Sequence, residues 1–210
     1  MKVYIVRHGQ STTNALDYHS MKDDDLTELG IKQAEELRDK IKNINFDIII
    51  CSPLVRAQHT AKIININSNK IIFDDRIQER NPGNLGGKSR ENENREEYWN
   101  YYTTIQYGTS ENIQEFFKRV YNFLDELKTK DYKSVLIVAH SGVSKAFNGY
   151  FEGIQDGKFL KRGLKNCEIR KYKLWKSYMF RMFTSSKKEK VLKGQKQYYI
   201  SCVNFFINAV

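Results

Sequence analysis

Three short apolar runs dominate the hydrophobic pattern of the chain, at residues 2–6, 47–51 and 134–139. Short, nearly continuous runs of this kind are typical of strands that are buried on both faces of a parallel sheet. Residues 166–174 predict a last strand, and residues 71–73 predict a further short one. The pattern therefore predicts a sheet of mainly parallel strands.

Apolar side chains at helical spacing precede the second and third runs. The first stripe consists of Ile31, Ala34, Leu37, Ile41 and Ile44, and the second of Ile113, Phe116, Phe117, Val120, Leu124 and Leu127. Another helix is expected to begin near Gly142. Strands that alternate with helices predict βαβ units. We therefore predict a three-layer α/β fold, with an open, mostly parallel sheet and helices on both of its faces.

The length of 210 residues suits one domain whose core needs no metal or disulfide. We place this domain at residues 1–174. Within it, residues 80–110 are polar and then aromatic, which is typical of a lid or insertion over the sheet, where specificity often lies. Residues 175–210 are predicted to form a separate basic and aromatic tail of unassigned role.

Hydrophobic residues make up 40% and charged residues 29% of the chain, which argues against a disordered protein. The chain starts with a strand-like run rather than a signal peptide, and no apolar segment reaches the roughly 18 residues of a membrane span. Cys51, Cys167 and Cys202 are an odd number at unrelated spacings, which is typical of reduced thiols. These features favour a cytoplasmic globular protein.

The net charge of +10 is uneven, with about −2 over residues 1–157 and about +12 over residues 158–210. Either this excess attracts an anionic partner or it is an ordinary solvated Lys-rich surface, and we favour the second interpretation. No nucleic-acid-binding motif is present, so no nucleic acid partner is expected. A Lys cluster at 187–196 precedes apolar residues 198–210, which leaves contact of the tail with an anionic surface open. The oligomeric state does not follow from the sequence.

The residues that carry chemistry follow the three buried runs. Arg7 and His8 lie directly after the first run, Arg56 follows the second and His140 follows the third. Ligands of open α/β sheets bind beyond the carboxyl ends of the strands, so these side chains are expected at one edge of the sheet. A neighbouring Arg disfavours protonation of an imidazole and also binds phosphate oxygens. The arrangement predicts a neutral, nucleophilic histidine in an anion site.

Several sequence blocks carry a family resemblance. They are Arg7-His8-Gly9 with Asn14, Leu26-Thr27-Glu28-Leu29-Gly30 with Gln33-Ala34, Ser52-Pro53-Leu54 with Arg56-Ala57 and Thr60-Ala61, Glu79-Arg80 with Gly83, Leu85 and Gly87, and Ala139-His140-Ser141-Gly142. In this combination, over residues 1 to about 174, they resemble the histidine phosphatase (phosphoglycerate mutase-like) superfamily. They are similar to its branch of cofactor-dependent phosphoglycerate mutases and fructose-2,6-bisphosphatases. The resemblance implies a phosphoglycerate mutase-like fold.

The resemblance also implies roles for individual residues. His8 attacks phosphorus and becomes phosphohistidine, which splits one difficult transfer into two easier steps. Glu79 donates a proton to the leaving oxygen and then activates water. The residues implied to bind the phosphoryl group are Arg7, Asn14, Arg56 and His140. Arg80 is a further substrate-binding candidate, which would meet an acidic group of the substrate. Two Arg and a His neutralise the phosphoryl charge without a metal, so no metal site is expected.

Other polar residues are expected to have no part in the reaction. Asp23-Asp24-Asp25 is taken as a solvated loop rather than a metal site, and His19 and His59 as incidental histidines. Residues 17–21 replace the small polar stretch that mutases usually show, so no ligand is assigned there.

The lid decides between two reactions. Mutases of this branch present an adjacent Arg pair there to hold the substrate carboxylate, whereas this chain has Trp99-Asn100-Tyr101, with Arg90 and Arg95 as isolated candidates. Without the pair, water is the favoured acceptor, and we predict a phosphatase that hydrolyses a small phosphate ester without a cofactor. The alternative is a mutase that uses 2,3-bisphosphoglycerate. A non-catalytic phospho-ligand binding protein is disfavoured, because the catalytic set is complete.

Overall fold

A computed structural model describes residues 1–154 and 156–175. The predicted tail, with its Lys cluster, its apolar end and Cys202, lies almost entirely outside the described residues. The five strands of the sheet are β1 (Lys2–Arg7), β2 (Ile48–Cys51), β3 (Ile71–Phe73), β4 (Ser134–Ala139) and β5 (Ile169–Lys173). Their order is β3-β2-β4-β1-β5, and only β5 runs antiparallel to its neighbour. The predicted mostly parallel sheet is confirmed.

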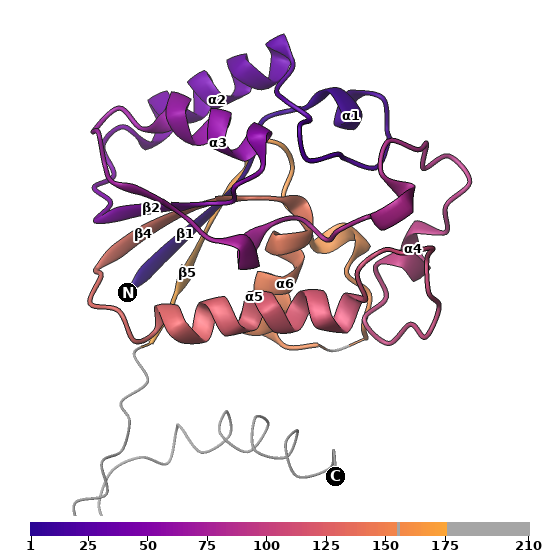
Figure 1. The fold of residues 1–210 in the computed structure, drawn as a ribbon. Coiled ribbons are helices and arrows are strands. Elements are labelled where there is room, and N and C mark those ends of the chain that lie inside the picture. The colour runs from indigo at the N-terminus through magenta and orange to yellow at the C-terminus, as the bar shows by residue number, and fades with distance from the viewer. Residues whose placement is uncertain (155, 176–210) are drawn as a thin grey trace, which may run out of the picture. The chain divides into compact units, whose positions relative to one another are not determined.

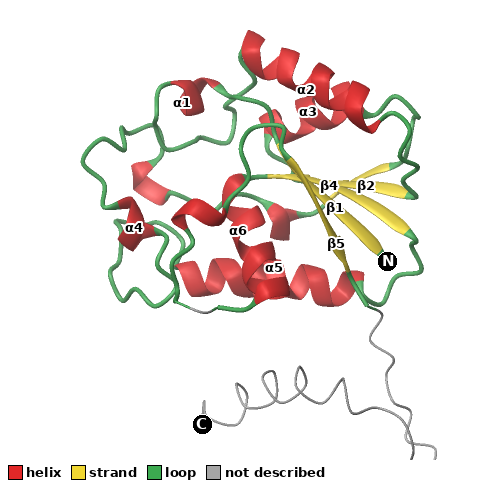
Figure 2. Cartoon of the chain, turned by 180° about the vertical axis from the view of Figure 1, so that it is seen from behind, coloured by secondary structure: helices red, strands yellow, loops and turns green. Residues whose placement is uncertain are grey.

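Two pairs of helices cover the two faces of this sheet. Helices α2 (Glu28–Ile41) and α3 (Val55–Ile64) lie on one face, and α5 (Ile113–Leu127) and α6 (Ser141–Glu152) lie on the other (Figures 1 and 2). Two short helices, α1 (Thr12–Ala15) and α4 (Arg95–Tyr98), lie in the loops beyond the sheet. Single turns of 3₁₀-helix occur at Asp75–Ile77, Gly83–Leu85 and Leu160–Arg162. The predicted three-layer α/β architecture is present.

The side chains of β4 show why the strands have continuous apolar sequences. Val135 and Ile137 belong to the core under α5 and α6, whereas Leu136 and Val138 belong to the core under α2 and α3. All four are at most 1% exposed. Alternate residues of a strand point to opposite faces, so a strand covered on both faces needs an apolar residue at every position.

A close backbone contact fixes the loop that follows β1. A Cβ atom on Gly9 would lie 2.3 Å from the carbonyl oxygen of Gly30 in α2, and a Cβ on Gly30 would lie 2.0 Å from that of Gln10. No side chain fits at either position, so both glycines are required by the contact itself. The loop that carries His8 is thereby held against the first turn of α2.

The predicted lid, residues 80–110, is hydrogen-bonded to the rest of the chain on two sides. The backbone N–H of Tyr101 donates to the carbonyl of Gly157 over 2.7 Å. At the other side, Tyr18 and Ser89 form an antiparallel bridge. The lid is therefore anchored both to the segment that follows α6 and to the loop that follows α1.

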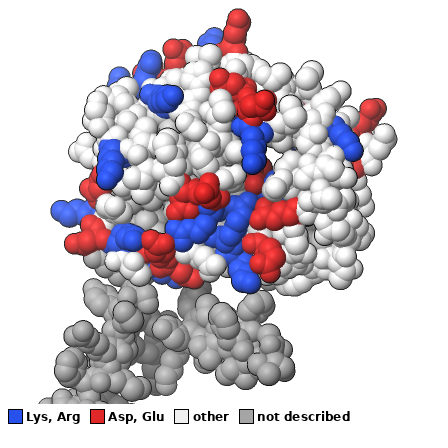
Figure 3. Space-filling view, in the orientation of Figure 1, with Lys and Arg blue, Asp and Glu red and all other residues white. Residues whose placement is uncertain are grey.

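Charges of both signs are interleaved on the face of the molecule that Figure 3 shows. Among the described residues, many charges of opposite sign are paired, as in the Arg76–Asp74 contact at 2.6 Å and the Arg119–Glu111 contact at 2.6 Å. This face therefore presents no patch of a single sign. Within residues 1–154 and 156–175, no helix has both the length and the apolar character that a membrane span requires.

Candidate active site

A pocket of about 680 Å³ lies beyond the carboxyl ends of β1, β2 and β4. Its volume is in the range of small-molecule sites. The predicted residues that line it are Arg7, His8, Asn14, Arg56, Glu79 and Arg80. His140 is fully buried behind this wall, and its ring centre lies 5.1 Å from that of His8. The structure thus brings together residues that the sequence spreads over more than 130 positions.

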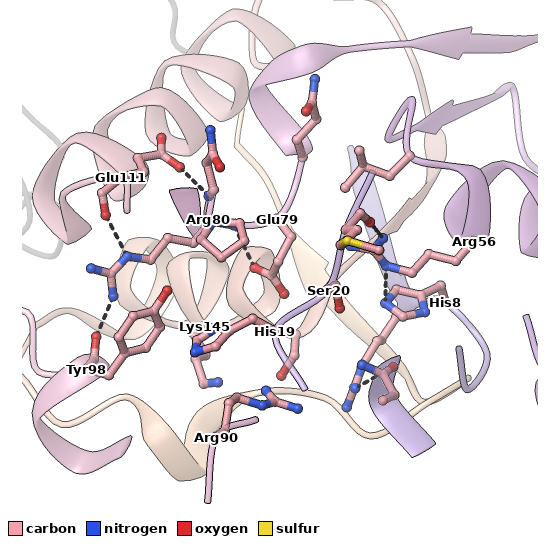
Figure 4. A pocket seen from close by; sticks show the side chains of 18 of the residues that line it. His8, His19, Ser20, Arg56, Glu79, Arg80, Arg90, Tyr98, Glu111 and Lys145 are labelled. Atoms are coloured by element: carbon pink, nitrogen blue, oxygen red, sulfur yellow. Dashed lines mark hydrogen bonds between the residues drawn. The ribbon is translucent and has the colours of Figure 1, made fainter. Parts of the chain in front are cut away.

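The hydrogen bonds of His8 define its reactive nitrogen. Nδ1 lies 2.6 Å from the carbonyl oxygen of Gly9, and Nε2 lies 3.2 Å from Nε of Arg56, which donates to it. A carbonyl only accepts and a guanidinium only donates, so this network assigns the ring proton to Nδ1 and the lone pair to Nε2. His8 is 2% exposed, and its reactive nitrogen faces Arg56 in the pocket (Figure 4).

The surroundings of His8 also keep its ring neutral. Burial, followed by the positive charges of Arg56 and Arg7, lowers the pKa of His8 well below its usual 6.5. Both causes disfavour the imidazolium, the first by desolvation and the second by repulsion. The ring is therefore neutral at pH 7, as a nucleophile must be.

Arg56 lies in the first turn of α3 and is 1% exposed. Besides its contact with His8, its Nη1 donates to the carbonyl of Met21 over 2.8 Å. Met21 belongs to the stretch in which the sequence assigned no ligand, so that loop takes part in the site through its backbone. The carboxylates of Glu79 and Asp24 provide the nearest negative charge.

Arg7 is held by two acceptors and keeps one donor unused. Its Nη1 donates to the carbonyl of Leu164 over 3.1 Å, and its Nη2 donates to Oδ1 of Asn14 over 3.2 Å. Its Nε is buried and has no hydrogen-bond partner among the described residues. Asn166, which no sequence pattern indicated, donates to the same Asn14 oxygen and to the carbonyl of His8. A buried donor without a partner is costly, and an anion in the pocket would satisfy it.

His140 precedes the first turn of α6, as its N-cap residue. Its Nε2 lies 2.7 Å from Oγ of Ser52, and its Nδ1 is buried without a partner among the described residues. Burial, and after it the positive charge of Arg56, lowers its pKa well below 6.5, so this ring is neutral as well. When the Ser52 hydroxyl donates to Nε2, Nδ1 carries the proton and can donate to a phosphate oxygen.

Glu79 is positioned by backbone groups on both of its carboxylate oxygens. Oε2 accepts from the N–H of Gly142 over 3.0 Å, and Oε1 accepts from the N–H of Arg80 over 2.9 Å. A Cβ on Gly142 would lie 2.0 Å from Oε1, so a side chain there would displace the Glu79 carboxylate. Arg119 donates to the carbonyl of Glu79 over 3.0 Å. These contacts hold the carboxylate in the pocket, near His8 (Figure 4).

Arg80 lines the pocket, but its hydrogen bonds lie inside the lid and at its end. The sequence suggested that it meets an acidic group of the substrate, but the residue is 4% exposed. Its Nε and Nη1 donate to the carbonyls of Glu111 and Tyr98, and its guanidinium lies 4.0 Å from the ring centre of Tyr98. We therefore assign Arg80 to the internal structure of the lid rather than to the substrate.

One expectation about the neighbouring polar residues is wrong. Asp24 is 7% exposed rather than solvated, and it accepts hydrogen bonds from Ser11 and Thr13 behind the His8 loop. His19 is buried in the pocket wall, where its Nε2 lies 3.1 Å from Oε1 of Glu93. Within the described part of the chain, no group of three or more His, Cys, Asp or Glu side chains is arranged to hold a metal ion.

The sequence reasoning did not identify Lys145, which lines the pocket although it is only 4% exposed. A usable signal existed. Lys145 lies four residues after Ser141 in a helix that was expected to begin at the site, and side chains four apart share a helix face. A lone lysine among small and apolar residues of such a helix indicates a polar role.

Known proteins resemble the chain in sequence and in fold. Residues 3–180 match the histidine phosphatase superfamily (branch 1). The chain is 30% identical to the adenosylcobalamin/alpha-ribazole phosphatase of Escherichia coli (strain K12), over 68% of this chain and 75% of that protein. It is 29% identical to phosphoserine phosphatase 1 of Hydrogenobacter thermophilus, over 80% of this chain and 83% of that one.

Among solved structures, phosphoserine phosphatase of Entamoeba histolytica in complex with 3-phosphoglyceric acid has the same fold. Its TM-score to this chain is 0.69 at 25% identity, over 81% of this chain and 89% of that one. The fold and the family that the sequence indicated are both confirmed.

Proposed function

The chain belongs to the histidine phosphatase superfamily and is a phosphatase of that family. From the geometry of its site, we propose that His8 takes the phosphoryl group of a small phosphate ester and passes it to water. The observation that carries this proposal is the pair of hydrogen bonds on His8, which leave the lone pair on Nε2 in the pocket. The lowered pKa of the ring keeps that lone pair available at neutral pH.

In the first step, Nε2 of His8 attacks phosphorus and the N–P bond forms while the P–O bond of the ester breaks. Glu79 gives its proton to the leaving alkoxide, which would otherwise leave poorly. Arg56 turns from Nε2 to the phosphoryl oxygens, where Arg7 Nε and His140 Nδ1 also donate. Positioning and charge neutralisation of this kind supply most of what phosphoryl transfer requires.

In the second step, a water oxygen attacks phosphorus and the N–P bond breaks. Glu79, now a carboxylate, takes a proton from the water, and inorganic phosphate leaves. Each group returns to its starting state, so the two steps together hydrolyse one ester bond without a cofactor. The two backbone N–H groups on Glu79 keep the carboxylate in one place for both proton transfers.

The acceptor distinguishes a phosphatase from a mutase. Where the related mutases are expected to present an adjacent Arg pair, this chain has Trp99, whose ring packs against Phe116 and Tyr98. The Arg pair that orients a phosphoglycerate acceptor in the mutases is replaced at this position, so water is the proposed acceptor. A mutase would need 2,3-bisphosphoglycerate to load His8.

A panel of phosphate esters tests the proposal, with and without 2,3-bisphosphoglycerate, on the wild type and on His8→Ala. We expect inorganic phosphate to be released by the wild type and lost by roughly 10³-fold or more in the variant, because the nucleophile is gone. Interconversion of 2- and 3-phosphoglycerate would replace the phosphatase with a mutase. Phosphate release that survives in His8→Ala would overturn the mechanism.

A further inference from the structure

A buried lysine of helix α6 lines the pocket and has no salt bridge to any described residue. Lys145 projects from α6, and its ammonium lies 3.9 Å from the centre of the Trp99 ring. Its side chain passes close to Gly163, where a Cβ would lie 3.2 Å from Lys145 Cε. No carboxylate of residues 1–154 and 156–175 forms a salt bridge with it, although the charge of Glu79 acts on it. Burying an unpaired ammonium is unfavourable, so this position favours a ligand that brings a negative charge.

Arg90 of the lid makes a second, independent contribution at the same place. Its Nη2 pairs with Oδ1 of Asp17 over 3.1 Å, but its Nε is buried without a hydrogen-bond partner among the described residues. The charge of Arg90 acts on both Lys145 and Arg7, so its guanidinium lies near both. The ammonium of Lys145, from α6, and the unused Nε donor of Arg90, from the lid, therefore lie in the same pocket.

The part of the pocket beside Lys145 and Arg90 is distinct from the place where the phosphoryl group reacts. Figure 4 shows Lys145 and Arg90 on one side of Glu79, with His8 and Arg56 on its other side. All five residues line the same pocket. An ester that places its phosphorus at His8 and its leaving oxygen at Glu79 would extend its remaining part towards Lys145 and Arg90.

We propose that Lys145 and Arg90 form a second anion subsite, which holds a carboxylate or a further phosphate group of the ester whose phosphoryl group reacts with His8. The subsite rests on the proposed function, since it assigns the class of substrate for the same pocket. Phosphorylated acids and bisphosphates are then preferred over phosphate esters of neutral alcohols. A charged hydrogen bond that the neutral ester cannot make accounts for the preference.

Titration of Lys145 supplies a signature of this role. Burial lowers the pKa of Lys145 to about 7; Glu79 opposes the shift, whereas Arg7 and Arg90 add to it. Below this pKa the ammonium is charged and binds an anion, and above it the neutral amine does not. The KM for an acidic ester should therefore rise as the pH increases through about 7. In Lys145→Arg, whose guanidinium stays charged, the rise should disappear.

The direct test compares matched esters in the wild type and in Lys145→Met. For a carboxylate the pair is 3-phosphoglycerate against glycerol 3-phosphate, and for a phosphate it is fructose 1,6-bisphosphate against fructose 6-phosphate. We expect the ratio of kcat/KM within one pair to fall by roughly tenfold or more in Lys145→Met, chiefly through KM. The pair of esters whose kcat/KM ratio falls shows whether the second anion is a carboxylate or a phosphate. Lys118→Met, at an exposed lysine of α5, is the matched control and should keep both ratios.

Two further measurements keep the outcomes separate. Calorimetric binding of 3-phosphoglycerate to His8→Ala and to the His8→Ala, Lys145→Met double variant tests the subsite even if no ester is hydrolysed. Thermal unfolding shows whether Lys145→Met is folded, and its Tm should not fall, because a buried unpaired charge is removed. The subsite would be overturned if Lys145→Met lowered kcat/KM equally for both esters of each pair. It would also be overturned if the kcat/KM ratios and the calorimetric affinity for 3-phosphoglycerate were all unchanged. Such a result would leave the proposed hydrolysis intact.

Discussion

The two walls of the pocket are built in different ways. His8, Arg56 and His140 follow buried strands at the edge of the sheet, and each is at most 2% exposed. The opposite wall comes from residues 80–110, whose regular structure is limited to short turns and to α4. The comparison teaches that the proposed nucleophile and two of its phosphate-binding partners lie at the ends of buried strands, whereas the opposite wall is built from a long loop segment.

Glu79 lies where the two walls meet, and changing it should have the largest effect. In Glu79→Gln, the leaving oxygen of an alkyl ester loses its proton donor, so kcat should fall by roughly 10²- to 10⁴-fold. With 4-nitrophenyl phosphate, whose leaving group needs little protonation, the first step survives and only hydrolysis of the phosphoenzyme slows. Rapid mixing should then show a burst of nitrophenol.

The matched control is Glu115→Gln on α5, where the side chain is 65% exposed. It should hydrolyse both kinds of ester at the wild-type rate. Equal losses on the alkyl and aryl esters, with no burst, would show that Glu79 does not transfer the proton.

Arg56 belongs to the sheet edge, and its change tests the electrostatics of that wall. In Arg56→Gln, one donor to the phosphoryl oxygens is lost, and the rate should fall by roughly 10²- to 10³-fold. The acid limb of kcat/KM reports protonation of free His8, whose lowered pKa places the limb well below pH 6.5 in the wild type. Without the Arg56 charge the limb should move up, although burial still holds it below 6.5.

Arg56→Lys separates the two effects of this residue. The positive charge is kept, so the acid limb should stay close to that of the wild type. The rate should still fall, because an ammonium cannot present the parallel N–H donors of a guanidinium. An acid limb near pH 6.5 in the wild-type profile would contradict the neutral, buried His8.

Arg80 tests the lid, where the expected effect is smallest. Arg80→Met leaves the buried carbonyls of Tyr98 and Glu111 without their charged donor, which should cost about 2 kcal/mol of stability. For a domain of this size, Tm should fall by about 4–8 °C. Because Arg80 does not reach the phosphoryl group, KM should change more than kcat.

Arg38→Met, at a partly exposed arginine of α2, is the control and should leave both Tm and KM unchanged. A loss of kcat with an unchanged Tm in Arg80→Met would instead show that Arg80 contacts the substrate, as the sequence suggested.

The same division explains what could be predicted from the sequence. Strands such as β4 are specified by continuous apolar runs, and the rule that ligands bind beyond strand ends placed Arg7, His8 and His140 together. Glu79 lies in a loop, where no periodicity fixes its position, and only the family resemblance identified it.

The lid and the unused polar groups were harder to predict because tertiary contacts decide them. Arg80 and Arg90 are both lid arginines, yet one donates to buried carbonyls and the other keeps a free donor in the pocket. Asp24 looked like one of three solvated acids, but hydrogen bonds from the loop after β1 bury it. Nothing in the local sequence distinguishes these outcomes.

The most direct test of the account is to identify the phosphorylated atom. The wild type and Glu79→Gln are mixed with 4-nitrophenyl phosphate, quenched in alkali to preserve phosphohistidine, and analysed by peptide mass spectrometry and phosphorus NMR. The account predicts a single phosphoryl group on Nε2 of His8, more abundant in Glu79→Gln than in the wild type. Phosphorylation of Nδ1, phosphorylation of another residue, or no phosphoenzyme in either protein would contradict it.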